Sequence, residues 1–195
     1  DNRNLQKSVD KIYNAITRAN NIIKDTLSFS RQSTFQVKNI PLYPLLDNSL
    51  TLSRHIIRKN GITLKRDYED ELLEIAADHN MLEQVLLNLI KNAVDAMKDR
   101  KEKKLIIRMY KQKVTQIDYK TGSRRSDFFK LGGEMVIVEI SDTGAGIPKD
   151  VLPKIFEPFF TTKSTNEGTG LGLSLVHMIM ERLSGTVDVR SRVDY

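Results

Sequence analysis

Apolar and small residues recur at heptad spacing along the first thirty positions of the chain. They stand alternately four and three residues apart, at Leu5, Val9, Ile12, Ile16, Ala19, Ile23, Thr26 and Ser30. This spacing predicts one long helix with a narrow apolar seam, and such a helix cannot bury its seam alone. The seam needs a partner helix from preceding sequence, from a second copy of the chain, or from both. The alternative is a helix that lies on the domain that follows.

Prolines interrupt the helical pattern after residue 36. Pro41 and Pro44 stand close together, and the residue before a proline is pushed out of the helical region. We therefore place a boundary near residue 36. It divides the chain into a helical segment, residues 1–35, and a main domain, residues 36–195.

The main domain alternates between helical and strand patterns of apolar residues. Helical spacing predicts helices over residues 45–59, 80–97 and 171–183. Short β-branched runs predict strands over residues 62–66, 72–76, 105–110, 135–140 and 186–190. The polar stretch 111–134 is predicted to be a long, mobile hairpin loop. Helices and strands that mix without strict alternation indicate an α+β fold, a two-layer sandwich of one mixed sheet covered on one face by helices.

Composition narrows the possible functions. The 195 residues can form one domain and an appendage. The net charge of +6 is spread among interspersed acidic residues, so no nucleic-acid partner is expected. The absence of cysteine excludes disulfides, thiolate metal sites and cysteine nucleophiles.

The chain also lacks an apolar run of ~18 residues and a signal peptide. We therefore expect a cytoplasmic fragment without membrane contact of its own. Because the chain opens on Asp1 within a helical pattern, we expect it to be a piece of a longer protein. Whether that protein is anchored in a membrane is left open.

Three alternate glycines mark the turn that opens the predicted helix 171–183. Gly168, Gly170 and Gly172 have no Cβ, so the backbone can approach a bulky anion and adopt positive φ. The helix that follows presents unpaired amide hydrogens and a partial positive charge, which favour phosphate oxygens. The aromatic and basic run 156–163 just before them has the features of a lid over a nucleotide polyphosphate. The alternative is a flexible loop before an ordinary helix, and the segment fits neither the P-loop nor the Rossmann fingerprint.

The predicted helix 80–97 carries polar residues that share one face. Asn88 and Asn92 are four residues apart, and Asp95 lies about one turn further on. Magnesium prefers hard oxygen ligands, and an asparagine amide oxygen can complete an octahedron of phosphate oxygens and waters. The helix is therefore a candidate magnesium site, or else it exposes an ordinary polar face to solvent.

A third motif follows the predicted strand 135–140, where the chain continues through Asp142, Gly144 and Gly146. A carboxylate at the end of a strand can accept a hydrogen bond from the exocyclic amine of adenine, and the bare glycines let a flat base approach. Guanine has no amine at that edge, so the motif would distinguish the two bases. A simple Asp-Gly turn is the alternative.

Taken together, the four motifs resemble the N, G1, F and G2 boxes of sensor histidine kinases. They occupy residues 88–93, 142–146, 156–163 and 168–172, in the order and at the separations of that family. The resemblance implies that residues 36–195 form an ATP-binding catalytic domain, with the Bergerat-type fold of gyrase, heat-shock chaperone and mismatch-repair ATPases. Residues 1–35 resemble the second helix of the family's dimerisation and phosphotransfer hairpin. Residues 92–97 and 159–163 are most similar to the nitrogen-regulation kinases.

The resemblance implies ATP and Mg²⁺ as cofactors and gives roles to individual residues. Asp142 would bind the adenine amine, and Asn92 would ligate the metal. Asn88 and Lys91 would lie near the phosphates. No residue is implied with certainty to be catalytic.

The lid would close on the triphosphate through Lys163 and the glycine amides, anchored by Phe156, Phe159 and Phe160. Asn88 and Lys163 are the phosphate-positioning candidates. The implied ATP-binding set is Asn88, Lys91, Asn92, Asp95, Asp142, Gly144, Gly146, Ile147, Phe159, Thr162, Lys163, Gly168, Thr169, Gly170, Leu171, Gly172 and Leu173.

The implied activity is transfer of the γ-phosphoryl group of ATP to a histidine. The family's acceptor histidine is followed by an acidic residue and a proline, and this pattern surrounds none of His55, His79 and His177. The acceptor is therefore expected on an upstream helix absent from this chain, for relay to the aspartate of a response-regulator receiver domain. A homodimer is expected through residues 1–35 together with the missing upstream helix.

Two other functions remain open. ATP hydrolases of the same fold carry a glutamate four residues before the magnesium asparagine, as a general base that activates water. Asn88 has this position and no basic lone pair, so hydrolysis is expected to be slow. The other alternative is a nucleotide-binding or dimerisation module without kinase activity.

Two further expectations concern the lid and the last strand of the fold. Residues 164–167 alone separate Lys163 from Gly168, so the lid is short and is expected to become ordered when nucleotide binds. The family closes its sheet with a further strand, and the chain stops at Tyr195 before it. The last strand of the fold is therefore expected to be missing.

Overall fold

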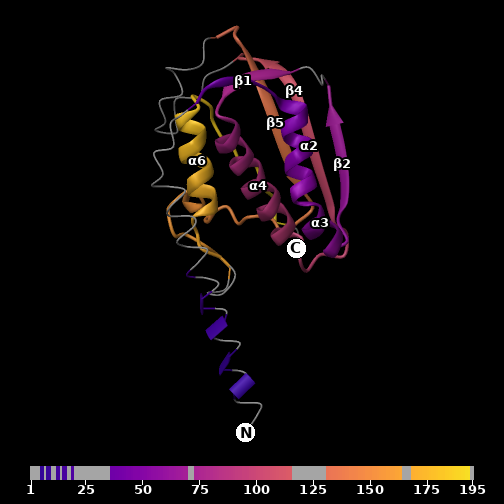
Figure 1. The fold of residues 1–195 in the computed structure, drawn as a ribbon, viewed down its shortest axis with the longest axis vertical. Coiled ribbons are helices and arrows are strands. Elements are labelled where there is room, and N and C mark those ends of the chain that lie inside the picture. Colours follow the sequence, from indigo (N-terminus) through magenta and orange to yellow (C-terminus); the bar gives the residue numbers. More distant parts are fainter. Residues whose placement is uncertain are drawn as a thin grey trace.

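The computed structural model describes residues 36–69, 73–115, 131–163 and 168–193, together with scattered positions between residues 5 and 19. Its helices and strands alternate irregularly along the chain (Figure 1). They are β1 (Lys38–Pro41), α2 (Leu42–Leu52), α3 (Arg54–Lys59), β2 (Thr63–Tyr68), β3 (Glu74–Ala77), α4 (His79–Ala96), β4 (Lys104–Lys113), β5 (Glu134–Asp142), the short 3₁₀ helix η1 (Leu152–Lys154) and α6 (Gly172–Arg182).

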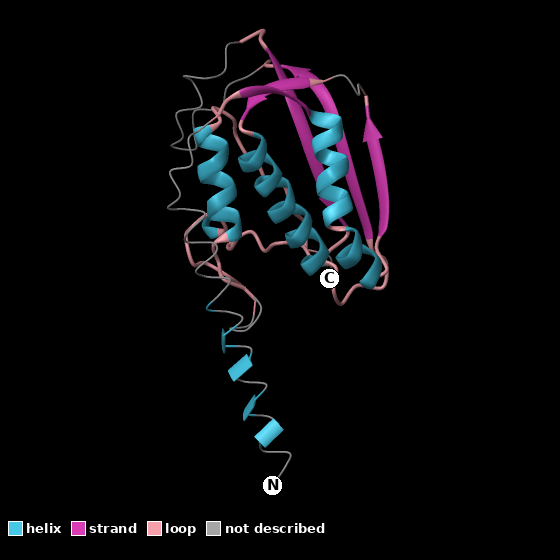
Figure 2. Ribbon diagram, viewed as in Figure 1, coloured by secondary structure: helices cyan, strands magenta, loops and turns pink. Residues whose placement is uncertain are grey.

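Three strands form a mixed sheet in the order β2-β4-β5. β2 runs parallel to β4, and β4 runs antiparallel to β5 with Leu105 opposite Asp142. Helices α2, α4 and α6 lie on one side of this sheet, so the molecule has two layers (Figure 2). The predicted α+β sandwich is therefore confirmed. β1 and β3 form a separate antiparallel pair. The sequence pattern did not predict β1, and it did not separate the strand that became β3 from the main sheet.

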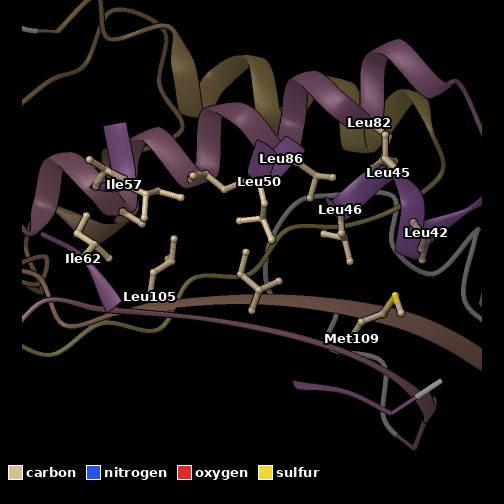
Figure 3. Packing of buried hydrophobic residues seen from close by; sticks show 14 of the residues in the cluster. Leu42, Leu45, Leu46, Leu50, Ile57, Ile62, Leu82, Leu86, Leu105 and Met109 are labelled. Carbon is tan, nitrogen blue, oxygen red and sulfur yellow. The ribbon is translucent and has the colours of Figure 1, made fainter. Parts of the chain in front are cut away.

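Alternate residues of β4 line the core. Leu105, Ile107 and Met109 are fully buried, whereas Ile106 and Arg108 between them are partly covered. A strand has a side-chain period of two, so one face of β4 lies under the helices. The apolar face of α2 packs above it through Leu42, Leu45, Leu46 and Leu50 (Figure 3).

Helix α4 is packed on two sides. Leu86 and Ile90 belong to the main core above the sheet. Val85 belongs to a second cluster, together with Leu175 and Ile179 of α6. The central helix is therefore held between the sheet and α6, and its remaining face is left for polar residues.

The start of α4 is fixed by Asp78, a carboxylate that is only 6% exposed. One carboxylate oxygen accepts a hydrogen bond from the amide of Met81 at 3.1 Å, as an N-cap does. The other oxygen accepts from the amide of Gln36, also at 3.1 Å. Asp78 therefore joins the beginning of the main domain to the first turn of its central helix.

Two predicted elements differ from the structure. The helix expected over residues 45–59 is interrupted at Ser53, which ends α2 and begins α3. The strand expected over residues 186–190 is wrong, because the chain there is irregular. A strand needs a hydrogen-bonded neighbour. This segment is instead held by Val187, which packs on the second cluster, and by the Ser191 hydroxyl, which accepts from the amide of Ile147 at 2.8 Å.

Strands β4 and β5 extend into the stretch predicted to be a loop, residues 111–134. Lys113 pairs with Glu134, and the amide of Val114 donates to the carbonyl of Gly133 at 2.8 Å. Residues 111–113 are polar and exposed, so they lack the apolar alternation of a strand although the backbone register continues. The centre of the predicted hairpin loop, residues 116–130, lies outside the described residues.

Most of the long helix predicted within residues 1–35 also lies outside the described residues. The described positions between residues 5 and 19 are helical. Their seam side chains are exposed, with Leu5 at 66%, Val9 at 56%, Ile12 at 60% and Ile16 at 56%. These four residues do not lie on the main domain, against the alternative considered from the sequence. Within the described part of the chain, no helix is long and apolar enough to cross a membrane.

Candidate functional site

The polar face of α4 meets the start of α6. The side-chain amide of Asn88 donates to the carbonyl of Gln84 at 3.0 Å, which fixes the direction of its oxygen. A Cβ added to Gly172 would lie 3.2 Å from that oxygen and 3.9 Å from the amide nitrogen of Asn92. Gly172 therefore allows the first turn of α6 to approach both asparagines. No side chain caps this helix start, so its first amides can face an anion.

The end of β5 is joined to the end of α4. The amide of Gly144 donates to the carboxylate of Asp142 at 2.8 Å, and the amide of Ala145 donates to the carbonyl of Ala96 at 3.0 Å. A Cβ on Gly144 would come within 2.6 Å of both the Ala96 side chain and the Asp142 carboxylate. Only glycine therefore fits between the strand end and the helix.

Burial raises the pKa of Asp142, and the hydrogen bond from Gly144 opposes this rise. The residue as a whole is exposed, so the carboxyl group is only partly removed from solvent. A partly desolvated carboxylate with one fixed donor keeps acceptor positions for a further N–H group. Asp142 is thus suited to bind an exocyclic amine.

Thr143 is a residue whose role the sequence did not indicate. Its hydroxyl oxygen accepts a hydrogen bond from the amide of Lys104 and donates to the carbonyl of Glu102, both at 2.9 Å. The hydroxyl thereby ties the residue after Asp142 to the turn that precedes β4. A threonine hydroxyl at a strand end is a common backbone partner, but its two partners lie about forty residues earlier and leave no local signal.

Two segments, residues 159–163 (the phenylalanine arm) and residues 168–172 (the glycine arm), lie against each other. A Cβ on Gly168 would be 2.6 Å from the hydroxyl of Thr161. A Cβ on Gly170 would be 2.5 Å from the carbonyl oxygen of Phe159. The backbone is left-handed at both Gly170 and Phe159, with φ of 69° and 68°. The glycines therefore make room for the opposite arm.

The aromatic residues of the predicted lid have different environments. The ring of Phe156 lies 5.3 Å, between centroids, from that of His177 on α6. Phe160 is partly buried. Phe159 is 69% exposed, so in this structure it does not anchor the lid, contrary to what the resemblance implied. The predicted ordering of residues 164–167 lies outside the described residues.

Lys163 connects the phenylalanine arm to α4. Its ammonium nitrogen lies 2.6 Å from a carboxylate oxygen of Asp95, and each side chain is 33% exposed. The pair joins residues that are 68 positions apart in the sequence. With the contacts of Gly172 and Gly144, it brings all four sequence motifs together around α4.

The remaining predicted site residues lie at the edges of this arrangement. Lys91 and Thr162 are exposed, and neither forms a hydrogen bond or ion pair with another predicted site residue in the described part of the chain. Gly146, with φ of 74°, allows the backbone of Arg192 to pass close by. In the glycine arm, the Thr169 hydroxyl accepts from the amide of Leu171 at 3.4 Å. Leu171 is buried, Leu173 is partly buried, and Ile147 bonds Ser191 as described above.

The described residues contain no group of three or more histidine, cysteine, aspartate and glutamate side chains that could hold a metal ion. A metal at this site would therefore depend on oxygen atoms of a bound anion. Mg²⁺ fits this condition, because it is commonly bound by one or two protein oxygens with phosphate oxygens and waters. Asn92 on α4 carries an amide oxygen of the kind that could serve as its protein ligand.

Solved structures with similar folds are histidine kinases. The catalytic domain of histidine kinase ThkA, in a nucleotide-free form, matches with a TM-score of 0.57 and 30% identity, over 75% of this chain and 81% of that one. ThkA in complex with the response regulator TrrA matches with a TM-score of 0.65 and 28% identity, over 95% of this chain and 46% of that one.

Similar curated proteins are sensor kinases. Sensor kinase CckA of Brucella abortus (strain 2308) is 36% identical over 177 residues, which are 90% of this chain and 18% of CckA. Sensor histidine kinase ZraS of Escherichia coli (strain K12) is 34% identical over 90% of this chain and 32% of ZraS. The chain therefore spans a third or less of these relatives. The family model for histidine kinase-, DNA gyrase B- and HSP90-like ATPases matches residues 77–194. The chain belongs to this ATPase family, and its relatives within it are sensor histidine kinases.

Proposed function

We propose that this chain is the ATP-binding catalytic part of a sensor histidine kinase. It binds MgATP and transfers the γ-phosphoryl group to a histidine on a helix that precedes it in the longer protein. The observation that carries this proposal is the meeting of four distant motifs around α4, through Gly172 on Asn88, Gly144 on Ala96, and Lys163 on Asp95. The family membership and the sensor kinase relatives support it.

The proposed roles follow the positions of the residues. Asp142 accepts the adenine amine, because its carboxyl group is partly desolvated and has one fixed donor. Asn92 ligates Mg²⁺, which would neutralise charge on the phosphates when bound. Asn88, Lys163 and the first amides of α6 face the phosphates. The protein positions the phosphoryl group and balances its charge, which are the main requirements of phosphoryl transfer.

The acceptor histidine is proposed to lie outside this chain. His55 is exposed on α3, His79 is in the first turn of α4, and His177 packs on Phe156. None of them has the sequence pattern of an acceptor. The exposed seam of residues 5–16 supports pairing with an upstream helix and with a second copy of the chain.

A response-regulator receiver domain is proposed as the next phosphoryl acceptor, supported by the ThkA complex with TrrA. Because ATP is a cytoplasmic metabolite, we propose that this part of the protein works in the cytoplasm.

The competing function is ATP hydrolysis, and Asn88 argues against it. Its amide nitrogen is engaged with Gln84, and an amide cannot take a proton from water as a glutamate can. Phosphoryl transfer to histidine therefore fits this site better than activation of water. Brisk ATP turnover without any histidine acceptor would contradict this choice.

The decisive experiment supplies the missing acceptor. A protein that carries the upstream helix is incubated with this chain and radiolabelled MgATP, and acid-labile phosphate on the acceptor is measured. We expect labelling with the wild type and none with Asp142→Asn, while the control Asp150→Asn, in the exposed turn after Ile147, labels normally. Absence of labelling by a wild type that binds MgATP would leave a nucleotide-binding module and refute the kinase proposal.

A further inference from the structure

The ion pair between Lys163 and Asp95 occupies the group that the proposed function needs for phosphate. The nitrogen-to-oxygen distance is 2.6 Å, and two thirds of each side chain is covered. Charge-assisted hydrogen bonds of this length are the stronger class of side-chain contact. In this state the lysine has a protein carboxylate as its partner.

The position of Asp95 explains why this pairing matters. The residue lies about one turn after Asn92 on α4, on the face that carries the proposed metal ligand. Its neighbour Ala96 receives the hydrogen bond from Ala145 that joins β5 to the helix. Asp95 therefore lies between the proposed base site and the proposed phosphate site, with the lysine drawn onto it.

A carboxylate at this position is unfavourable next to a bound triphosphate. Like charges in a partly covered site repel each other, and a triphosphate offers a lysine more negative charge than one carboxylate does. The lysine thus has two alternative partners, a protein carboxylate and a phosphate group of the nucleotide.

We propose that Asp95 is a positioning residue, the resting counter-ion that holds Lys163 on α4 until a nucleotide polyphosphate replaces it. This inference rests on the proposed function and concerns the same site. The predicted role of Asp95 as a direct ATP ligand is replaced by an exchange of partners. MgATP must break the Asp95 pair, so the apparent affinity is lowered by the fraction of molecules in which the pair is formed.

The exchange predicts the direction in which MgATP affinity changes when the Asp95 carboxylate is removed. Removing the carboxylate releases Lys163 for the phosphates, so Asp95→Asn should bind MgATP more tightly. Partly exposed ion pairs are weak, so the gain should be about 3-fold. Adenosine has no phosphate, so its affinity should be unchanged.

The experiment is calorimetric titration of the whole 195-residue chain with MgATP and with adenosine. The variants are Asp95→Asn, Lys163→Gln and their combination, with Asp95→Ser as a second replacement and a thermal melt to verify folding. Asp99→Asn is the matched control, because it removes the same charge from an exposed position in the turn after α4. We expect tighter MgATP binding for both Asp95 variants, no gain when Lys163 is also replaced, and wild-type affinity for the control.

Three results would overturn the inference. Unchanged or weaker MgATP binding by both folded Asp95 variants would exclude the exchange. A gain that persists in the Lys163→Gln background would show direct repulsion of phosphate without a lysine partner. An equal gain for Asp99→Asn would show a general charge effect. A wild type that binds no MgATP would instead overturn the proposed function, and this inference with it.

Discussion

Replacing Gly170 by alanine tests whether the packing of the two arms matters for nucleotide binding. Gly170 has a φ of 69°, and a Cβ there would lie 2.5 Å from the carbonyl oxygen and 2.7 Å from the Cα of Phe159. An ordinary contact begins at 3.4 Å, so the phenylalanine arm must move by about 1 Å to accept a methyl group. Lys163 is part of that arm and would move with it.

The magnitude can be worked from two terms. A left-handed alanine costs about 1–2 kcal/mol, and overpacking against a backbone costs about 1–3 kcal/mol. The free chain can relieve this strain because its two arms can separate locally. The nucleotide-bound chain cannot, because both arms must hold the nucleotide. The lower ends of these two ranges add up to about 2 kcal/mol. If this strain destabilises only the nucleotide-bound state, MgATP affinity falls by about 30-fold.

The control is Gly61→Ala. Gly61 also has a left-handed φ, 65°, but a Cβ there meets nothing within 4 Å. This variant should lose about 1 kcal/mol of stability and keep its affinity for MgATP. Calorimetric titration and thermal melts measure both quantities. Wild-type affinity for Gly170→Ala, or an equal loss of affinity for Gly61→Ala, would refute the assigned role of the arms.

Three further predictions concern single side chains. Because burial raises the pKa of Asp142, adenosine binding should weaken as the pH falls through that raised value, at a higher pH than for an ordinary aspartate. The raised pKa also means that the protonated carboxyl of Asp142 stabilises the folded chain, and that this stabilisation is lost as the pH rises through the raised pKa. At pH 7, Asp142→Asn should therefore melt no lower than the wild type, although the variant no longer binds adenosine. Thr143→Val should weaken adenosine binding by about 3- to 10-fold through loss of two hydrogen bonds, and Thr143→Ser should restore it; equal affinities for the two variants would contradict the assigned bridge. Asp78→Ala should lower the free energy of unfolding by about 1–2 kcal/mol in urea, because α4 loses its N-cap and Gln36 loses its partner; an unchanged midpoint would exclude that role.

Much of the fold could be predicted because its signals are local. The helix predicted over residues 80–97 is α4, and the alternation at Leu105, Ile107 and Met109 marks β4. Such patterns depend on side chains a few positions apart. The strand expected over residues 186–190 is absent because strand formation depends on a partner backbone elsewhere, which composition does not reveal.

The candidate site divides in the same way. The residues of each motif could be located from the sequence, since Asn88 and Asn92, or Asp142 and Gly144, are close together. Each motif alone left an ordinary alternative open, and only the four together resemble the boxes of sensor histidine kinases. The bridge from Thr143 to Glu102 and the pair of Lys163 with Asp95 join residues 41 and 68 positions apart. The residues next to each partner in the sequence carry no signal of the other partner. These contacts could therefore be seen only in the folded chain.

By itself, the sequence determined the two-layer α+β class and the central helix, because periodicity and short-range spacing encode them. The identity of the four motifs came from their joint resemblance to the boxes of sensor histidine kinases. Only the tertiary structure showed which close contacts the glycines permit. Gly168 and Gly170 make room for the phenylalanine arm, and Gly172 makes room for Asn88. It also decided that Asp95 faces a lysine and that Phe159 faces solvent. The physical reason is that a missing Cβ, a charge or an aromatic ring acquires its effect from the atoms packed against it.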